Sequence, residues 1–233
     1  MNCALITGAS RGIGRATARL FRDADWRAVS LSRSHVAEEG IEHLALDLAS
    51  HSWEEEMGEV IRSAADGADR VALVHNAASY ESDRADALPA AQLRRVMEVN
   101  LVGPARLNQL LLPAMGEGSA IIYVGSTLSE KAVPGAASYS ISKHALLGLM
   151  RATCQDLGSR GIHTCAICPG FTDTEMLRSH IGAVPGLETE FKARVPSDRL
   201  IQPEEIAQLI FDAAQRPVLN GSVIHAHLGQ IER

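Results

Sequence analysis

The chain has 233 residues, of which 46% are hydrophobic and 21% charged, and its 22 basic and 28 acidic residues give a net charge of −6. The acidic balance excludes the basic footprint of a nucleic-acid-binding protein, and no apolar run approaches the roughly 20 residues of a membrane helix. The N-terminal residues lead into a strand-like segment without a basic leader, and the four cysteines lack the spacing of a disulfide framework. We therefore expect a cytoplasmic protein with one large core, a single domain over residues 1–233.

Short apolar runs alternate with longer helical patterns along the chain. This alternation predicts an α/β protein, and nearly continuous apolar strands indicate a parallel sheet buried on both faces. We expect a single-domain Rossmann fold, a doubly wound parallel sheet of about seven strands with helices on both faces. The predicted strands cover 2–7, 27–32, 42–46, 70–75, 119–125, 162–168 and 222–227, and the predicted helices 12–24, 50–66, 88–114, 138–159 and 203–215.

Two connections depart from this alternation. Residues 34–44 are too few for a full helix between the second and third strands, so we expect a truncated or irregular crossover. Residues 173–198 form a long stretch punctuated by Gly and Pro, which we interpret as a substrate-loop region able to act as a lid. The alternative is that this stretch is a surface loop without a role in function.

Cys165 and Cys168 have the Cys-x-x-Cys spacing of redox and metal sites. Both lie in the predicted strand 162–168, where residues three apart point to opposite faces. We therefore interpret them as core cysteines, and we expect no metal site.

The first predicted strand leads into a glycine-rich turn at residues 7–14 (TGASRGIG), and a helix follows. Glycines let such a turn close tightly and let backbone N–H groups approach a pyrophosphate at the helix N-terminus. An ordinary glycine turn is the alternative. The turn residues that we expect to bind a dinucleotide are Gly8, Ser10, Arg11, Gly12, Ile13 and Gly14.

The end of the second predicted strand bears on the choice between NADP(H) and NAD(H). An acidic residue there would bind the ribose 2′-hydroxyl of NAD, but this chain has Ser32 followed by Arg33. Arg11 can converge on the same place, and two guanidinium groups suit a 2′-phosphate. We predict NADP(H), with NAD(H) as the weaker choice. The alternative is that both arginines are solvated surface charges.

Tyr139 and Lys143 stand four residues apart in the predicted helix 138–159, so they lie on one face, one turn apart. An ammonium near a phenol should lower the pKa of Tyr139 and allow it to exchange a proton with an oxygen near neutral pH. Ser126 precedes the tyrosine at the end of the fifth predicted strand.

Together these motifs resemble the short-chain dehydrogenase/reductase family in its compact single-domain form, over essentially the whole chain. The resemblance implies a catalytic tetrad of Asn100, Ser126, Tyr139 and Lys143, in which Asn100 holds a water that links Lys143 to solvent. It also implies cofactor contacts that include the tetrad's tyrosine and lysine. Those outside the glycine turn are Ser32, Arg33, Asp47, Leu48, Asn76, Ala77, Ala78, Tyr139, Lys143, Pro169, Gly170, Thr172 and Thr174.

His75 and Ala78 depart from the family pattern, which has Asn and Gly at these positions. The Ala78 methyl should tighten the wall near the nicotinamide ribose. His75 is either a proton carrier or, as we expect, a packed and hydrogen-bonded histidine.

The resemblance implies an oxidoreductase that interconverts a ketone or aldehyde and its alcohol by hydride transfer, with Tyr139 as general acid or base. The expected pocket is apolar and lacks clustered arginine or lysine, so we predict a small to medium uncharged substrate. We expect Glu130, Lys131 and Arg178 to face solvent. The predicted pocket residues are Thr127, Leu128, Val133, Pro134, Phe171, Met176 and Leu177.

Three other functions use the same motifs: a catalytically silent dinucleotide-sensing protein, an NAD-dependent alcohol dehydrogenase, and an epimerase or lyase. The retained Tyr139 and Lys143 disfavour the sensor, and the short C-terminal part disfavours the epimerase. The family resemblance also implies a homodimer or homotetramer that pairs through the helices near 88–114 and 138–159. From the charge and the apolar pattern we expect no nucleic-acid or membrane partner.

Overall fold

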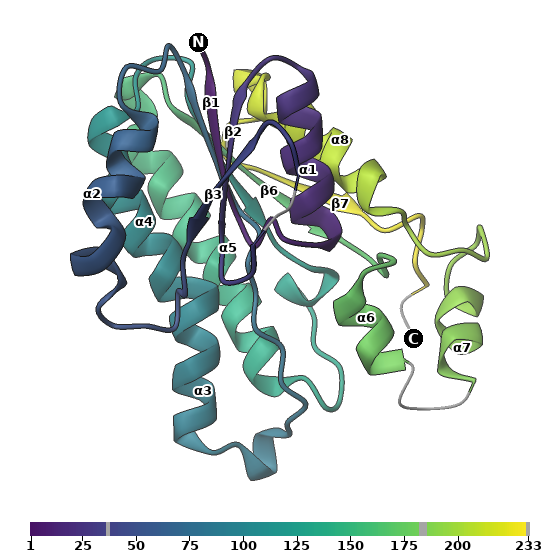
Figure 1. The fold of residues 1–233 in the computed structure, drawn as a ribbon. Coiled ribbons are helices and arrows are strands. Elements are labelled where there is room, and N and C mark those ends of the chain that lie inside the picture. The colour runs from purple at the N-terminus through teal and green to yellow at the C-terminus, as the bar shows by residue number, and fades with distance from the viewer. Residues whose placement is uncertain (36–37, 182–185, 232–233) are drawn as a thin grey trace.

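The computed structural model describes residues 1–35, 38–181 and 186–231. Seven parallel strands form one sheet in the order β3-β2-β1-β4-β5-β6-β7, so the expected doubly wound sheet is present. Figure 1 shows the sheet between two layers of helices. The strands are β1 (Cys3–Thr7), β2 (Arg27–Ser32), β3 (Ile41–Ala45), β4 (Val71–His75), β5 (Ala120–Val124), β6 (His163–Pro169) and β7 (Ser222–Ala226).

All five predicted helices are present, although the third is divided in two. The segment predicted as one helix over 88–114 is helical from α3 through α4, but a π-helical turn at Glu98–Val102 separates the two. The helices on the two faces of the sheet are α1 (Gly12–Asp23), α2 (Trp53–Ala65), α3 (Ala90–Met97), α4 (Gly103–Leu111), α5 (Ala137–Leu157) and α8 (Pro203–Ala214).

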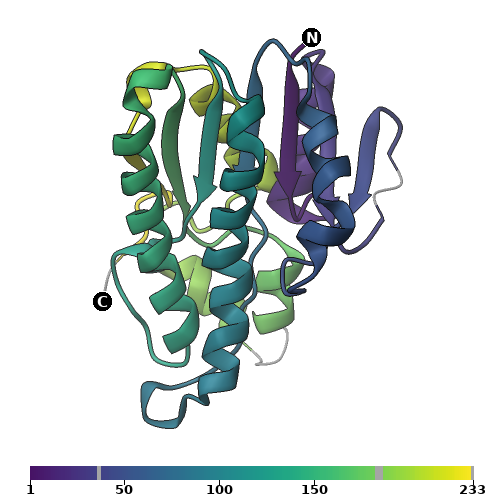
Figure 2. The same ribbon diagram turned by 90° about the vertical axis from the view of Figure 1, so that its left-hand side faces the viewer.

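Successive side chains along each strand point to opposite faces of the sheet, so the hydrophobic core has two parts, one on each face. Leu5 of β1 packs into one apolar cluster with residues of α2, α4 and α5, whereas its neighbour Ile6 packs into a second cluster with residues of α1 and α8. Cys168 belongs to the first cluster and Cys165 to the second, so the prediction that they face opposite sides is confirmed. Figure 2 shows α4 and α5 side by side on one face.

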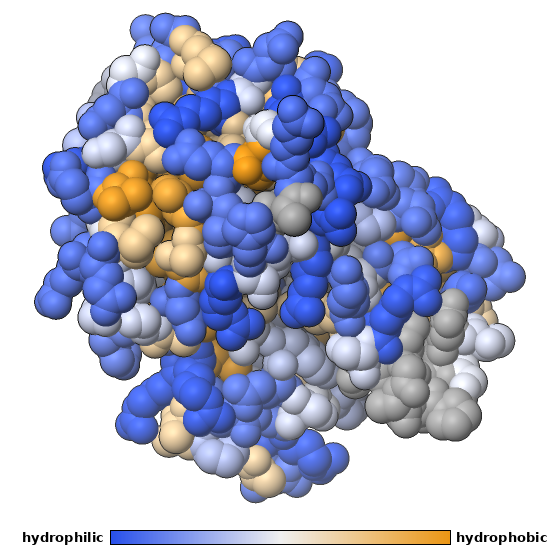
Figure 3. Space-filling model, viewed as in Figure 1, coloured by the Kyte–Doolittle hydropathy of each residue, from blue (hydrophilic) through white to orange (hydrophobic). Residues whose placement is uncertain are grey.

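The two irregular connections differ from each other. No helix lies between β2 and β3 in the described part of that crossover, so β3 is only partly covered. Figure 3 shows hydrophobic side chains at the surface beside α2 on this otherwise hydrophilic face. The predicted substrate-loop region 173–198 contains two short helices, α6 (Glu175–Ile181) and α7 (Leu187–Ala193), and its residues 182–185 lie outside the described residues. No helix in the described ranges combines the length and apolar character of a membrane span.

Candidate active site

The glycine-rich turn lies at the carboxyl end of β1, where the strand order reverses between β2 and β4. The Thr7 hydroxyl accepts hydrogen bonds from the backbone N–H groups of Asn76 and Ala77, both at 2.9 Å, and the Asn76 amide donates to the Thr7 carbonyl at 2.9 Å. A Cβ on Gly14 would lie 2.4 Å from Asn76 Nδ2, and Gly8 has a φ of +67°. Only glycine fits these two positions, so β1 and β4 meet closely under the turn.

A cavity of about 1320 Å³ runs from this turn to Tyr139 along the carboxyl ends of the strands. Gly14 packs behind the turn instead of lining the cavity. The long cavity and the glycine cradle therefore fit an extended dinucleotide. The predicted cofactor residues that line it are Gly8, Ser10, Arg11, Gly12, Ile13, Ser32, Arg33, Asp47, Leu48, Asn76, Ala77, Ala78, Tyr139, Lys143, Pro169, Gly170, Thr172 and Thr174.

Two arginines mark the end of the cavity at the second strand. Arg11 and Arg33 are both exposed, and neither side chain has a hydrogen bond or ion pair within the described part of the chain. The Ser32 hydroxyl instead donates to the Ser34 carbonyl at 2.9 Å, so its hydrogen is already used. The feature of this end that would attract an anion is therefore the positive charge of the two arginines and not the serine hydroxyl.

Ser126 is held by its own turn at the end of β5. Its hydroxyl accepts a hydrogen bond from Leu128 N at 3.1 Å, and its backbone N–H donates to the Ser129 hydroxyl at 3.1 Å. This reciprocal capping of a short 3-10 helix, Thr127–Ser129, orients the Ser126 hydroxyl toward Tyr139, with which it hydrogen-bonds.

Tyr139 and Lys143 lie on α5, as the spacing predicts. Lys143 is 2% exposed, and its Nζ donates to the Val124 carbonyl at 2.7 Å while lying 5.5 Å from the centre of the Tyr139 ring. Burial lowers the pKa of Lys143 from 10.5 to about 8. Burial also raises the pKa of Tyr139 from 10.0 to about 12, although the hydrogen bond with Ser126 opposes the shift.

The prediction that Lys143 lowers the pKa of Tyr139 is therefore wrong for this structure. The ammonium donates to the Val124 carbonyl, and removal of the phenol from water raises the pKa of Tyr139 by more than the hydrogen bond with Ser126 lowers it. Tyr139 consequently keeps its proton at neutral pH, which is the form that a general acid requires.

Asn100 lies in the π-helical turn and is buried. Its Oδ1 accepts from Ser79 N at 2.7 Å, and its Nδ2 donates to the Ser79 carbonyl and to the Ser142 hydroxyl, each at 2.9 Å. Both amide hydrogens thus bind protein groups and tie α5 to the segment after β4. The role of Asn100 in holding a water stays a prediction.

His75 is packed and hydrogen-bonded, as expected. It is buried beside the Tyr123 ring, and its Nε2 pairs with Asn108 Oδ1 at 2.8 Å. Burial lowers the pKa of His75 to about 4, so this histidine is neutral at physiological pH.

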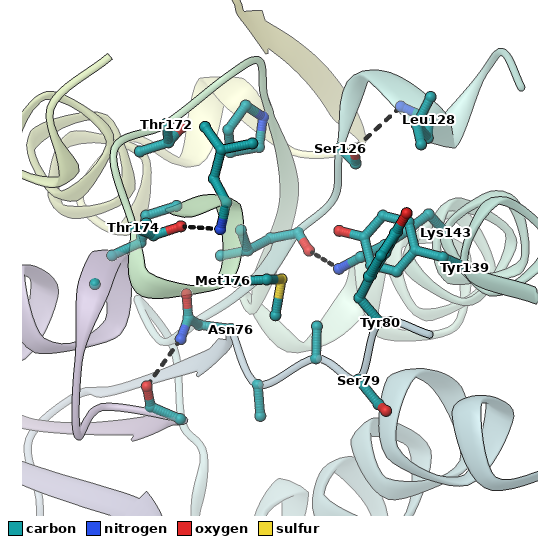
Figure 4. Close-up of a pocket in the computed structure, with 18 of the residues that line it drawn as sticks. Asn76, Ser79, Tyr80, Ser126, Leu128, Tyr139, Lys143, Thr172, Thr174 and Met176 are labelled. Atoms are coloured by element: carbon teal, nitrogen blue, oxygen red, sulfur yellow. Dashed lines mark hydrogen bonds between the residues drawn. The ribbon is translucent and has the colours of Figure 1, made fainter. Parts of the chain in front are cut away.

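The substrate end of the cavity contains an aromatic side chain that sequence reasoning missed. The Tyr80 ring packs edge-on against Tyr139, with centroids 5.3 Å apart, and Figure 4 shows Met176 projecting toward the middle of the cavity. Tyr80 follows the fourth-strand motif by only a few residues, and that proximity was the available signal. The predicted pocket residues that line this end are Thr127, Leu128, Val133, Pro134, Phe171, Met176 and Leu177.

Three basic residues outside the predicted pocket set also line the cavity. They are Lys131, which was predicted to face solvent, Arg95 of α3 and Arg194 at the end of α7. Arg95 pairs with Glu81 at 3.4 Å and Arg194 pairs with Glu190, so acidic partners offset both arginine charges.

Glu130 and Arg178 are exposed, as expected. Glu130 contacts His225 at 3.0 Å, and Arg178 forms an ion pair with Asp173.

Comparison with known proteins identifies relatives of this chain. A family model described as enoyl-(acyl carrier protein) reductase matches residues 8–229. Carbonyl reductase family member 4 of Xenopus tropicalis is 31% identical, over 95% of this chain and 94% of that protein. Protein FixR of Bradyrhizobium diazoefficiens is 35% identical, over 89% of this chain and 78% of that protein.

A solved structure supports the same relationship. A candidate NAD(P)-dependent gluconate 5-dehydrogenase from Beutenbergia cavernae, with NADP bound at low occupancy, superposes with a TM-score of 0.85. It is 28% identical and covers 98% of this chain and 96% of its own. The motifs, the seven-stranded sheet and these relatives together show that the chain belongs to the short-chain dehydrogenase/reductase family of oxidoreductases.

Proposed function

We propose that this oxidoreductase uses NADP(H) to interconvert a small to medium uncharged ketone or aldehyde and its alcohol. The observation that carries the proposal is that Ser126, Tyr139 and Lys143 line the same cavity as the glycine-rich turn. The exposed Arg11 and Arg33 support the preference for a 2′-phosphate.

The residues at the site have separate tasks in carbonyl reduction. When bound, NADPH supplies the hydride. Tyr139, protonated at neutral pH, donates its phenolic proton to the substrate oxygen, and the Ser126 hydroxyl hydrogen-bonds to that oxygen as negative charge develops. Lys143 adds a buried positive charge behind the tyrosine and, by family resemblance, holds the nicotinamide ribose hydroxyls.

The proposed substrate class rests on the lining of the cavity beyond Tyr139. Leu128, Val133, Phe171 and Met176 give this end an apolar wall, which suits an uncharged carbon skeleton. Arg95 and Arg194, which also line the cavity, are paired with glutamates, so they do not argue for an anionic substrate.

The test is consumption of NADPH with a panel of ketones and aldehydes, using the wild-type chain and Tyr139→Phe. Loss of the phenolic proton should lower kcat by about 10²- to 10⁴-fold, while NADPH binding, followed by fluorescence titration, stays close to wild type. Undiminished turnover by Tyr139→Phe would refute the assignment of the acid. NADPH binding without turnover on any carbonyl would instead support the sensing protein.

A further inference from the structure

The segment Ser79–Asp83 leaves β4 and crosses the N-terminal end of α5, the helix that carries Tyr139 and Lys143. Its first residue, Ser79, exchanges two hydrogen bonds with Asn100. Its second, Tyr80, packs against the Tyr139 ring. Its last, Asp83, donates its backbone N–H to the Gly135 carbonyl at 3.2 Å, just before α5 begins. This one segment therefore contacts several parts of the candidate active site.

Helix α5 begins without a cap of its own. The N-cap position is Ala136, whose methyl side chain cannot accept a hydrogen bond from the first turn. The first N–H groups of a helix have no partner within the helix and need an acceptor from elsewhere. Tyr139 lies in that first turn, so the groups that accept from these N–H groups also hold the backbone that carries Tyr139.

Asp83 supplies the missing acceptors. Its Oδ1 accepts from Ser138 N at 2.9 Å, its other carboxylate oxygen accepts from the Ser138 hydroxyl, and its backbone carbonyl accepts from Ala137 N at 3.4 Å. The Asp83 carboxylate thus does for α5 what an N-cap side chain does, although it comes from a residue far away in the sequence.

Asp83 as a residue is 7% exposed, and no lysine or arginine forms an ion pair with its carboxylate within 1–35, 38–181 and 186–231. Gln92 of α3 donates a further hydrogen bond at 2.9 Å. Burial raises the pKa of Asp83, but the hydrogen bonds from Ser138 and Gln92 outweigh it and hold the pKa below its usual range. A buried anion at the positive end of the α5 dipole is a favourable arrangement.

We propose that Asp83 is a positioning residue for the reaction: it caps α5 from outside the helix and thereby fixes Tyr139, the residue next to Ser138. The rate effect rests on the proposed function, because that function makes Tyr139 the acid. The cap itself is a property of the fold and can be tested without any turnover.

The experiment compares Asp83→Ala with Asp83→Asn and with the control Asp86→Ala, at a nearby residue whose exposed carboxylate pairs with Arg84. Asp83→Ala removes both acceptors and should lower kcat by about 10- to 100-fold, since small misplacements of a reacting group are costly. The dissociation constant for NADPH should stay close to wild type, because Asp83 lies outside the cavity lining. Asp83→Asn still accepts from Ser138 N and should recover most of the rate.

Hydrogen–deuterium exchange of the peptide spanning 136–143 provides the readout that is independent of substrate. Exchange should be faster in Asp83→Ala and unchanged in Asp86→Ala. Unchanged exchange in Asp83→Ala overturns the proposal even if no carbonyl is ever reduced. A wild-type kcat, or a fall in NADPH affinity as large as the fall in kcat, also overturns it.

Where Asp83→Ala does not fold, Ser138→Ala gives the same test in milder form, because it deletes the hydroxyl donor and leaves the backbone donor in place. We expect faster exchange over 136–143 and a smaller loss of kcat. Wild-type exchange and kcat in a folded Ser138→Ala protein would overturn the proposal.

Discussion

Burial of the Lys143 ammonium lowers the stability of this fold. Its side chain is 2% exposed, and the only acceptor recorded for its Nζ among the described residues is the Val124 carbonyl. The lowered pKa of about 8 means that the folded chain binds the Lys143 proton more weakly than the unfolded chain does. At neutral pH the protein therefore keeps a charge at the active site that opposes folding.

Lys143→Met should raise the free energy of unfolding at neutral pH by about 2 kcal/mol, because the cost of the buried charge exceeds the one hydrogen bond lost. The sign follows from linkage: the wild-type penalty is full below pH 8 and disappears as pH rises toward 10.5. The gain in Lys143→Met should therefore shrink over this window. Urea denaturation below and above it checks the prediction, and a variant less stable than wild type at neutral pH would contradict it.

Arg33 should decide the cofactor through its charge. Arg33→Asp replaces a cation at the cavity wall by an anion that repels a 2′-phosphate and can accept from a ribose hydroxyl. The ratio of kcat/KM for NADPH over NADH should fall by about 10- to 100-fold. Arg62→Asp, on α2 and paired with Glu59 away from the cavity, is the matched control. An unchanged ratio in Arg33→Asp would remove the basis for preferring NADP(H).

At the scale of elements, local patterns predicted most of the fold. The apolar runs placed β2 at its observed ends and α1 within one residue, since burial on both faces of a parallel strand leaves a continuous apolar signal. The π-helical turn at Glu98–Val102 was not predictable, because the hydrogen bonds between Asn100 and Ser79 that accompany it join distant segments. The short helices α6 and α7 were missed because Gly and Pro interrupt the pattern around them.

The residues of the candidate site also fall into those that the sequence predicts and those that it does not. Ser126, Tyr139 and Lys143 were predictable because their spacing and order are a property of the sequence. Tyr80 and Asp83 were not, since they act through contacts made across the fold. The direction of the Tyr139 pKa shift also escaped prediction, because it depends on how far the phenol is removed from water.

In the molecule as a whole, most of the apolar residues of α4 and α5 pack in the protein's own hydrophobic core. Leu107 and Leu111 of α4, and Leu146, Leu147 and Met150 of α5, belong to the core cluster against the sheet. The surplus of apolar residues on these helices is therefore weaker evidence for an oligomer than the sequence pattern suggests. Ile141 of α5 and Val102 before α4 remain exposed, at 45% and 38%.

We propose that the chain nevertheless forms a homodimer or homotetramer through these helices, and Gly148 provides the test. Gly148 is exposed on α5, and a Cβ there would meet no heavy atom within 4 Å among the described residues, so Gly148→Arg leaves the single chain undisturbed. In an assembly that packs α5 against a second copy, the same arginine would bring a bulky charge into the contact. Light scattering should show two or four chains for the wild type and a smaller species for Gly148→Arg. Gly116→Arg, at an equally open loop position, should keep the wild-type mass. A monomeric wild type, or Gly148→Arg with the wild-type mass, would exclude this face as the contact.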